Sequence, residues 1–508
     1  MRVNVVQGSI AAIDADAVIV NLFAGVKSPG GATGAVDRAT GGMISRLIAQ
    51  EAFAGKLGEC LTFYTDRLGA ASSDRLVKVV VAGLGPQASF DLEGARRAAA
   101  AAIKAASGPR INRVATIVHG AGIGGLDARE AAQALTEGSL LAAYRFEPYK
   151  SREPQNESRA TLPQELLVVE FDALKLAPIE EGVARGRLFA EATNAARDLV
   201  NTPPGKMRPE DLAAAARRVA QQAHLACEVL DEEAMERLGM GALLGVARGS
   251  AAPPRLVVMQ YRGGQEGPPD IALVGKGVTF DSGGLSLKTA EGMITMKDDM
   301  AGAAAVIGAM RIIGALRPPV NVLAVVPCVE NMPSGTALQP GEVLHTFGGK
   351  SIEVHNTDAE GRLILADAVA YARAQGARAI VDVATLTGAC GIALGDLYSG
   401  VVSNSDRLVD LLQQAAARTG ERYWRLPSDD EYKEKYASDI ADIKNVGGRL
   451  GGAIIGGMIV GEFAGDTPWL HIDIAPTAFV EKARHYLPKG ASGVAVRTLA
   501  ELVLAGGY

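Results

Sequence analysis

Short apolar runs alternate with alanine-rich stretches along the first 146 residues of the chain. Ala17–Leu22, Leu76–Gly83 and Val114–His119 have the length and the apolar content of buried strands. Leu92–Ala106 has the length and the alanine content of a helix. Strands that alternate with helices in this way predict an α/β domain.

A polar segment punctuated by prolines, Glu147–Glu165, follows this domain and has the composition of an exposed connection. Leu166–Phe171 then predicts one last strand, and Ile179–Val200 predicts a long helix that a proline pair ends. We therefore predict two α/β domains, a smaller one over residues 1–175 and a larger one over residues 176–508.

Strand and helix signals alternate again in the larger domain. The segments predict strand, helix, strand, helix and strand in the order Ile271–Thr279, Ala301–Gly314, Val320–Val326, Leu363–Ala374 and Ala379–Ala384. This order predicts a mostly parallel central sheet covered by helices. Ligands bind at the carboxyl ends of such strands, so we expect the chemistry in the loops after Thr279 and before Leu363.

The composition is that of a soluble globular protein, since 48% of the 508 residues are hydrophobic and 21% are charged. A formal net charge of −6 gives no chain-wide attraction to nucleic acid or to anionic lipid. Met1–Leu22 carries Asp14 and Asp16 within its apolar stretch and does not resemble a signal peptide. The uncharged apolar run Leu450–Gly461 is too short to cross a bilayer. We expect a cytoplasmic protein with neither membrane nor nucleic acid as a partner.

The cysteines are scattered, without a CxxC pair, which argues against a disulfide framework and against a thiolate zinc site. No HExxH motif and no GxSxG motif is present either. The chemistry is therefore expected from carboxylates and cations.

Charged residues gather in the two loops where a ligand is expected. Val274–Ala303 and Asn356–Leu363 together hold Lys276, Asp281, Lys288, Asp299, Asp358, Glu360 and Arg362. Taken singly, such charges are usually solvated ion pairs. Asp281, however, directly follows an apolar strand and precedes a glycine pair, which brings its carboxylate to the sheet edge.

Carboxylates suit hard divalent cations, and their oxygens can bridge two ions. The four charges of two such ions balance four carboxylates. Lys288 and Arg362 are then free to stabilise an anionic transition state or to hold an anion. The pattern predicts a two-metal hydrolase.

The motifs GKGVTFDSGG, SLK, MKDDMAGAA and NTDAEGRL resemble, in order and spacing, the active-site motifs of the leucyl aminopeptidase family. The NTDAEGRL octapeptide is very specific. The resemblance extends through the larger domain, from Ala196–Pro204 to Pro488–Gly493. The first domain resembles the family more loosely, and its layout is similar to that of macro domains.

The resemblance implies a metal-dependent aminopeptidase that releases N-terminal residues from short peptides with a free amino end. Two ions per subunit, manganese or zinc with magnesium as a third option, would be held by one shared set of ligands. One ion would be bound by Lys276, Asp281, Asp299 and Glu360, and the other by Asp281, Asp358 and Glu360.

The resemblance also assigns the remaining roles. Lys288 would polarise the scissile carbonyl, and Arg362 would hold a bicarbonate ion that takes a proton from water. Met296, Thr385 and Gly388 would line the pocket for the first residue, with a preference for leucine or another apolar side chain. The family's usual assembly implies a homohexamer.

One rival hypothesis comes from the first domain, where Gly120–Gly125 matches GxGxxG between a predicted strand and a predicted helix. The chain would then be a binding protein for ADP-ribose-like ligands or DNA, with peptidase activity secondary. The intact set of metal-ligand and cation positions favours the enzyme.

Overall fold

The computed structural model describes residues 1–69, 76–151 and 162–508. The chain packs as two compact units, Met1–Glu191 with Lys482–Lys489, and Ala192–Glu481 with Gly490–Tyr508. The predicted boundary after residue 175 stands at the start of helix α5 (Leu176–Asn201), whereas the two units divide within that helix. Residues 152–161 of the predicted polar connection lie outside the described residues.

The first unit contains one six-stranded sheet with the strand order β1-β6-β5-β2-β4-β3. Its pairs are parallel except β3 with β4. The elements of this unit before α5 are β1 (Arg2–Gln7), β2 (Ala17–Leu22), α1 (Gly31–Ala39), α2 (Met43–Ala49), β3 (Cys60–Thr65), β4 (Val77–Gly83), α3 (Leu92–Ala106), β5 (Arg113–Thr116), α4 (Ala128–Ala142) and β6 (Glu165–Glu170).

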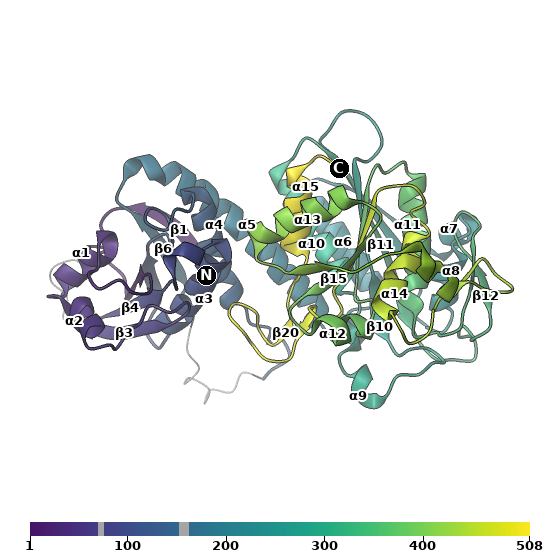
Figure 1. Ribbon diagram of the computed structural model, residues 1–508, viewed down its shortest axis with the longest axis horizontal. Coiled ribbons are helices and arrows are strands. Elements are labelled where there is room, and N and C mark those ends of the chain that lie inside the picture. Colours follow the sequence, from purple (N-terminus) through teal and green to yellow (C-terminus); the bar gives the residue numbers. More distant parts are fainter. Residues whose placement is uncertain (70–75, 152–161) are drawn as a thin grey trace. The chain divides into compact units, whose positions relative to one another are not determined.

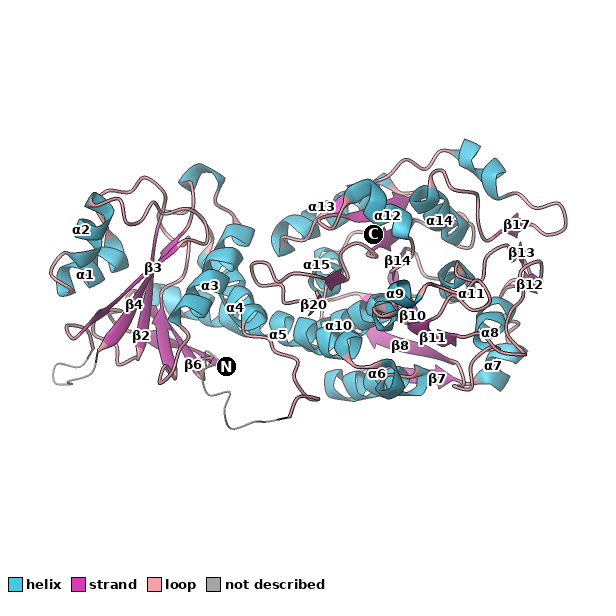
Figure 2. Ribbon diagram, turned by 90° about the horizontal axis from the view of Figure 1, so that it is seen from below, coloured by secondary structure: helices cyan, strands magenta, loops and turns pink. Residues whose placement is uncertain are grey.

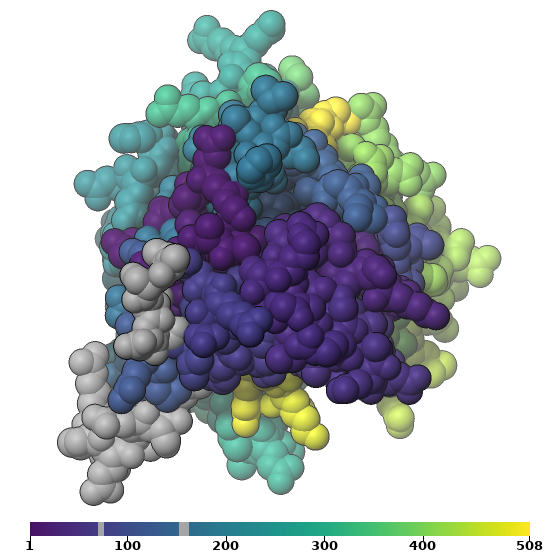
Figure 3. Space-filling view, turned by 90° about the vertical axis from the view of Figure 1, so that its left-hand side faces the viewer, coloured from purple at the N-terminus to yellow at the C-terminus, as the bar shows by residue number. Residues whose placement is uncertain are grey.

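Successive side chains along a strand point to opposite faces of a sheet. In this sheet both sets of side chains are apolar, so each face contributes to a core. In β2, Ile19 packs into a core shared with α3 and α4, whereas Val18 and Val20 pack into a core shared with Val36 of α1 and Ile44 of α2. Figure 2 shows the strands in magenta between these two helix pairs. Figure 3 faces this unit, where the early residues in purple form one continuous surface. The prediction of a smaller α/β domain is confirmed.

The second unit contains a nine-stranded sheet that follows the order β16-β15-β18-β14-β9-β11-β8-β7, with β10 paired to β11. Its strands are β7 (Ala226–Leu230), β8 (Arg255–Arg262), β9 (Ile271–Gly275), β10 (Gly277–Asp281), β11 (Asn321–Asn331), β14 (Ile380–Ala384), β15 (Ser399–Ser403), β16 (Tyr423–Arg425) and β18 (Trp469–Asp473). Short strands β12 (Val343–His345), β13 (Ser351–Glu353) and β17 (Ile443–Lys444) form a further sheet, and β19 (Phe479–Val480) pairs with β20 (Gly490–Ala491).

The centre of the large sheet is parallel, from β18 through β14 and β9 to β11, and the antiparallel pairs lie toward its edges. Helices cover it, as Figure 1 shows. After α5, the helices of this unit are α6 (Pro209–Ala223), α7 (Glu232–Arg237), α8 (Gly241–Ala247), α9 (Ala290–Met293), α10 (Ala301–Leu316), α11 (Glu360–Ala374), α12 (Gly388–Leu394), α13 (Asp406–Thr419), α14 (Gly452–Gly461) and α15 (Val496–Ala505). The predicted α/β class with a mostly parallel central sheet is confirmed.

The prediction of one strand over Ile271–Thr279 is wrong, because the segment forms two strands, β9 and β10. The break falls at Lys276, whose N–H donates to Val383 O at 3.0 Å and whose carbonyl accepts from Ala303 N at 2.8 Å. A hydrophobic pattern does not reveal such a break, because the two strands are apolar on both sides of it. The interruption turns the Lys276 side chain toward the carboxyl edge of the sheet.

Among the described residues, one helical stretch, Ala290–Leu316, has the length and the apolar composition of a membrane span. It contains α10, which packs against β9 and β14. Since 83% of its most apolar window is buried inside the protein, its hydrophobicity is explained by its place in the core.

Gly302, at the start of α10, lies where close backbone contacts leave no space for a side chain. An added Cβ atom would lie 2.0 Å from Val383 O and 3.0 Å from Lys276 N, both backbone atoms. We expect Gly302→Ala to destabilise the protein by about 3 kcal/mol, the cost of overpacking a rigid contact, and to lower the midpoint of thermal unfolding. Gly205→Ala is the matched control, because its Cβ meets nothing within 4 Å. Equal midpoints for the two variants would contradict the close approach.

Candidate active site

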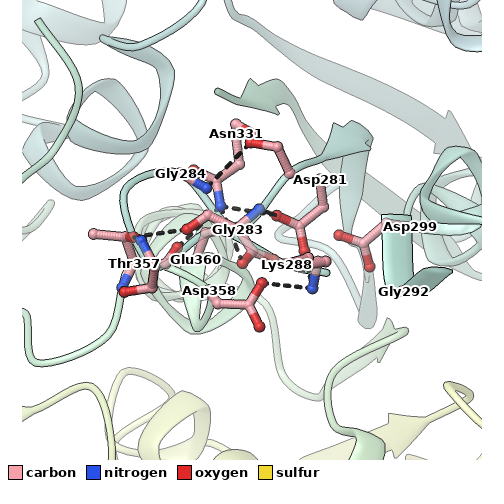
Figure 4. A network of polar contacts seen from close by, with 12 residues as sticks. Asp281, Gly283, Gly284, Lys288, Gly292, Asp299, Asn331, Thr357, Asp358 and Glu360 are labelled. Atoms are coloured by element: carbon pink, nitrogen blue, oxygen red, sulfur yellow. Dashed lines mark hydrogen bonds and ion pairs between the residues drawn. The ribbon is translucent and has the colours of Figure 1, made fainter. Parts of the chain in front are cut away.

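Neighbouring elements end or begin together at the carboxyl edge of the second unit's sheet. Lys276 follows β9, Asp281 ends β10, and Asn331 ends β11. Glu360 begins α11, and Thr385 follows β14. Because the central strands are parallel, these residues meet at one edge, and Figure 4 shows several of them gathered there.

Lys276 is an almost fully buried cation between two carboxylates. Its Nζ lies 2.7 Å from Asp299 Oδ1 and 2.8 Å from Glu360 Oε1, and it donates to Thr385 O at 2.9 Å. Burial alone lowers the pKa of Lys276, but the charges of Asp299, Glu360 and Asp281 outweigh burial and raise it above its ordinary value.

Lys288 forms a second bridge between carboxylates, on the more open side of the site. Its Nζ lies 2.7 Å from Asp281 Oδ2 and 2.5 Å from Asp358 Oδ1, and 18% of its side chain is exposed. Burial lowers the pKa of Lys288, and the two carboxylates overcome that effect and raise it. Lys288 therefore remains a positively charged donor at the mouth of the site.

The carboxylates lie close enough to share a cation. Asp281, Asp358 and Glu360 each offer an oxygen within 4.8 Å of the others, an arrangement that suits a metal ion. Burial is the main cause that raises the pKa values of Asp299, Asp358 and Glu360. A raised pKa means that the ionised form of a carboxyl group is disfavoured at its position. The ionised cluster therefore needs more positive charge than the neighbouring side chains supply.

A second observation, made at Asp299, also indicates that the carboxylates suit a divalent ion. Thr385 Oγ1 donates to Asp299 Oδ1 at 2.7 Å, whereas Asp299 Oδ2 is buried without a hydrogen-bond partner among the residues that the structure describes. A buried carboxylate oxygen without a donor is costly. A cation at this position would remove that cost.

Arg362 lies two residues into α11 and lines a cavity of about 250 Å³ together with Asp358 and Gly388. Its Nη1 donates to Asn445 O at 2.5 Å, and its buried Nε has no partner within the described part of the chain. Burial lowers the pKa of Arg362, but a guanidinium stays charged at neutral pH. The free donor is suited to an anion.

The residues predicted to line the first-residue pocket lie around this edge. Thr385 contacts Asp299 and Lys276 as described, and Gly388 begins α12 and lines the cavity. Met296 lies in a short 3-10 helix, Met296–Asp298, that packs against β10, and it is not among the residues lining that cavity.

Several polar residues that were not predicted from the sequence hold the site together. Asn331 donates to Asp281, Asn445 donates to Asn356 O of the NTDAEGRL segment, and the Asp473 carboxylate accepts from Leu386 N and Thr387 Oγ1. Each lies far along the chain from its partner, so no local pattern marks it. For Asn331 and Asp473, the signal available in the sequence is that each ends an apolar strand.

Fold and site together define a class of protein. A mostly parallel sheet carries at its carboxyl edge four carboxylates that pair with two lysines, and an arginine lines the cavity beside them. This is the layout of a metal-dependent hydrolase.

The chain belongs to the cytosol aminopeptidase family. The model of the family's catalytic domain matches residues 194–500, and that of its N-terminal domain matches residues 19–153. The protein is therefore a metal-dependent aminopeptidase, which confirms the predicted family and activity.

Relatives and solved structures agree over nearly the whole chain. Probable cytosol aminopeptidases of Alkaliphilus metalliredigens and Solibacter usitatus are 44% and 45% identical, each match covering 99% of both chains. A mutant of tomato leucine aminopeptidase is 30% identical with a TM-score of 0.87, and the match covers 100% of this chain and 97% of that one. The bottromycin maturation enzyme BotP in complex with Mn is 35% identical with a TM-score of 0.83, covering 97% and 99%.

The rival hypothesis of a nucleotide- or DNA-binding protein is not favoured. Two glycines of the Gly120–Gly125 segment also have a packing explanation, since a Cβ on Gly120 would lie 2.4 Å from a ring atom of Phe90. A Cβ on Gly124 would lie 2.4 Å from Gly120 O. The turn therefore requires glycine at these two positions for its own close packing.

Divalent cations are expected to stabilise the folded protein because the cluster holds four carboxylates and two lysines. Manganese added to metal-free protein at about 100 times its dissociation constant would contribute about 2.7 kcal/mol and raise the unfolding midpoint. Asp299→Asn should reduce that increase. Asp406→Asn, which alters a carboxylate whose side chain is 85% exposed on α13, should preserve it. Calorimetric scans with and without manganese provide the measurement, and an unchanged midpoint for the parent protein would contradict the metal site.

Proposed function

We propose that the enzyme binds two divalent ions per chain through shared carboxylates and cleaves the first residue from short peptides. Lys276, Asp281, Asp299 and Glu360 would hold one ion, and Asp281, Asp358 and Glu360 the other. The observation that carries this proposal is the approach of the Asp281, Asp358 and Glu360 oxygens to within 4.8 Å of one another. Asp299 Oδ2, which is buried without a hydrogen-bond partner among the described residues, supports the first site.

Manganese is the first ion to test, since BotP was solved in complex with Mn, and zinc and magnesium are the alternatives. When bound, a pair of divalent ions supplies Lewis-acid chemistry, acidifying water and offsetting charge that develops on a carbonyl oxygen. The chain's own residues then orient the peptide. The four carboxylates fix the position of the charge, and α11 holds Glu360 and Arg362 on one rigid element.

Lys288 is the proposed donor to the scissile carbonyl oxygen. Its ammonium lies within 2.7 Å of Asp281 and Asp358 and is partly exposed, so a substrate can reach it. A positive donor placed where negative charge develops stabilises the transition state.

Arg362 is the proposed site for bicarbonate, which when bound would supply a base for water. The buried Nε donor without a partner among described residues supports this assignment. Because Arg362 and Asp358 line the same cavity, an anion there would lie beside the carboxylate cluster.

Met296, Thr385 and Gly388 are proposed to line the pocket for an apolar first residue, with leucine preferred. A homohexamer in the cytoplasm completes the proposal, on the resemblance to the family. Light scattering of the purified protein tests the assembly.

We expect cleavage strictly at the amino end of a peptide. The charged residues of the cluster are mostly buried, and a neutral α-amine can act as a ligand of the bound ions. Leucine p-nitroanilide should be hydrolysed, and its N-acetyl derivative should not. The released nitroaniline is measured by absorbance. Equal rates on the two substrates would refute the proposed orientation.

Two lysine variants separate a metal ligand from a donor. Lys276 can bind metal only as a neutral amine, and arginine stays protonated, so Lys276→Arg should lose an ion. Lys288→Arg should retain both ions while losing rate, because its proposed role needs a positioned cation. Metal content by mass spectrometry and turnover of leucine p-nitroanilide are measured on both. Two ions per chain in Lys276→Arg at neutral pH would remove Lys276 from the ligand set.

A further inference from the structure

We infer that Asn331 is a positioning residue of the metal centre, which fixes Asp281 and Glu360, the two carboxylates proposed to bridge the ions. The inference rests on the proposed function. Asn331 ends β11, and the parallel register of β10 with β11 sets it directly opposite Asp281. Its side chain is buried within the cluster, with the residue 4% exposed.

The Asn331 amide group joins the elements that carry the ligands. Nδ2 donates to Asp281 Oδ1 at 2.8 Å and to Thr357 O at 2.9 Å, and Glu360 Oε2 lies 3.4 Å away. Thr357 lies just before α11, so one amide ties the end of β10 to the loop that leads to Glu360. Figure 4 shows Asn331 beside Asp281 on the side away from Lys288.

The chemistry of its neighbours fixes which way the amide faces. The partners of Nδ2 are two carboxylates and a carbonyl, which only accept hydrogen bonds, so an oxygen at that position would be repelled. Oδ1 faces Gly284 instead, where an added Cβ would lie 2.7 Å from it. The main chain is held as well, because Asn331 O accepts from Ser282 N at 3.0 Å and from Ser282 Oγ at 2.7 Å.

This arrangement selects the oxygen that Asp281 presents to the ions. Asp281 Oδ1 accepts from Asn331 Nδ2 and from Gly283 N, each at 2.8 Å. Asp281 Oδ2 is therefore the oxygen turned toward Lys288. An amide achieves this without adding charge, so the cluster keeps the negative charge that attracts cations. Outer residues that orient ligands typically change metal affinity by about 10 to 100-fold when they are removed.

A matched control lies at the other end of the same strand. Asn321 begins β11 and is also buried, at 7% exposed. Its amide bonds backbone groups, with Nδ2 donating to Gln265 O at 2.7 Å and Oδ1 accepting from Gly264 N at 3.1 Å. It resembles Asn331 in strand, burial and bonding, but it contacts none of the proposed ligands.

The test compares Asn331→Asp and Asn331→Ala with Asn321→Asp and Asn321→Ala in the full-length protein. Mn²⁺ affinity is measured by competition with a chelating indicator, and the unfolding midpoint of each metal-free variant is recorded. We expect both Asn331 variants to bind Mn²⁺ about 10 to 100-fold more weakly than the parent. Asn331→Asp should bind Mn²⁺ more weakly than Asn331→Ala, because it places a carboxylate oxygen opposite the acceptor oxygens of Asp281 and Thr357. Excess Mn²⁺ should restore turnover of Asn331→Ala with an unchanged KM for leucine p-nitroanilide.

Parent affinity in both Asn331 variants would overturn the inference while leaving the proposed metal site intact. An equal loss in the Asn321 variants would also overturn it, because the effect would then come from β11 as a whole. If one Asn331 variant does not fold, the other gives the answer. A parent protein that binds no Mn²⁺ would overturn both this inference and the proposed function.

Discussion

The second unit is organised around charges that its own side chains do not neutralise. Asp281, Asp299, Asp358 and Glu360 surround Lys276 and Lys288, which leaves an excess of negative charge in a largely buried place. Burial of such charge is costly unless a cation compensates it. This excess charge lies at one edge of the sheet, where the cluster is suited to hold divalent ions.

Neutral groups hold the cluster in shape. Thr357 Oγ1 donates to Gly283 O at 2.7 Å and accepts from Ser286 N at 2.8 Å, so it joins the two charged loops. Asn445 accepts from His355 N at 2.9 Å and its carbonyl accepts from Arg362. Because these partners are hydroxyls, amides and backbone groups, they hold the loops that carry the carboxylates without changing the charge that a metal meets.

Packing supplies the rigidity that this geometry needs. Gly302 brings α10 into backbone contact with β14, and Gly361 lets α11 approach Lys276, since a Cβ there would lie 2.9 Å from its Cε. Behind the site, Asp382 accepts from Trp469 Nε1 at 2.7 Å and pairs with His471 at 2.5 Å in a fully buried network. These two buried side-chain contacts join β14 to β18.

The sequence alone determined the α/β class, several of the strands and helices of each unit, and the charged residues of the two loops. These features follow from local periodicity and from residues adjacent in the chain, as with α3, predicted over its full length. Tertiary structure alone decided that Lys276 breaks a strand, that the two units divide inside α5, and that Asn331 meets Asp281 across 50 positions of sequence. Strand register sets that last contact, and register depends on the packing of the whole sheet rather than on any local pattern.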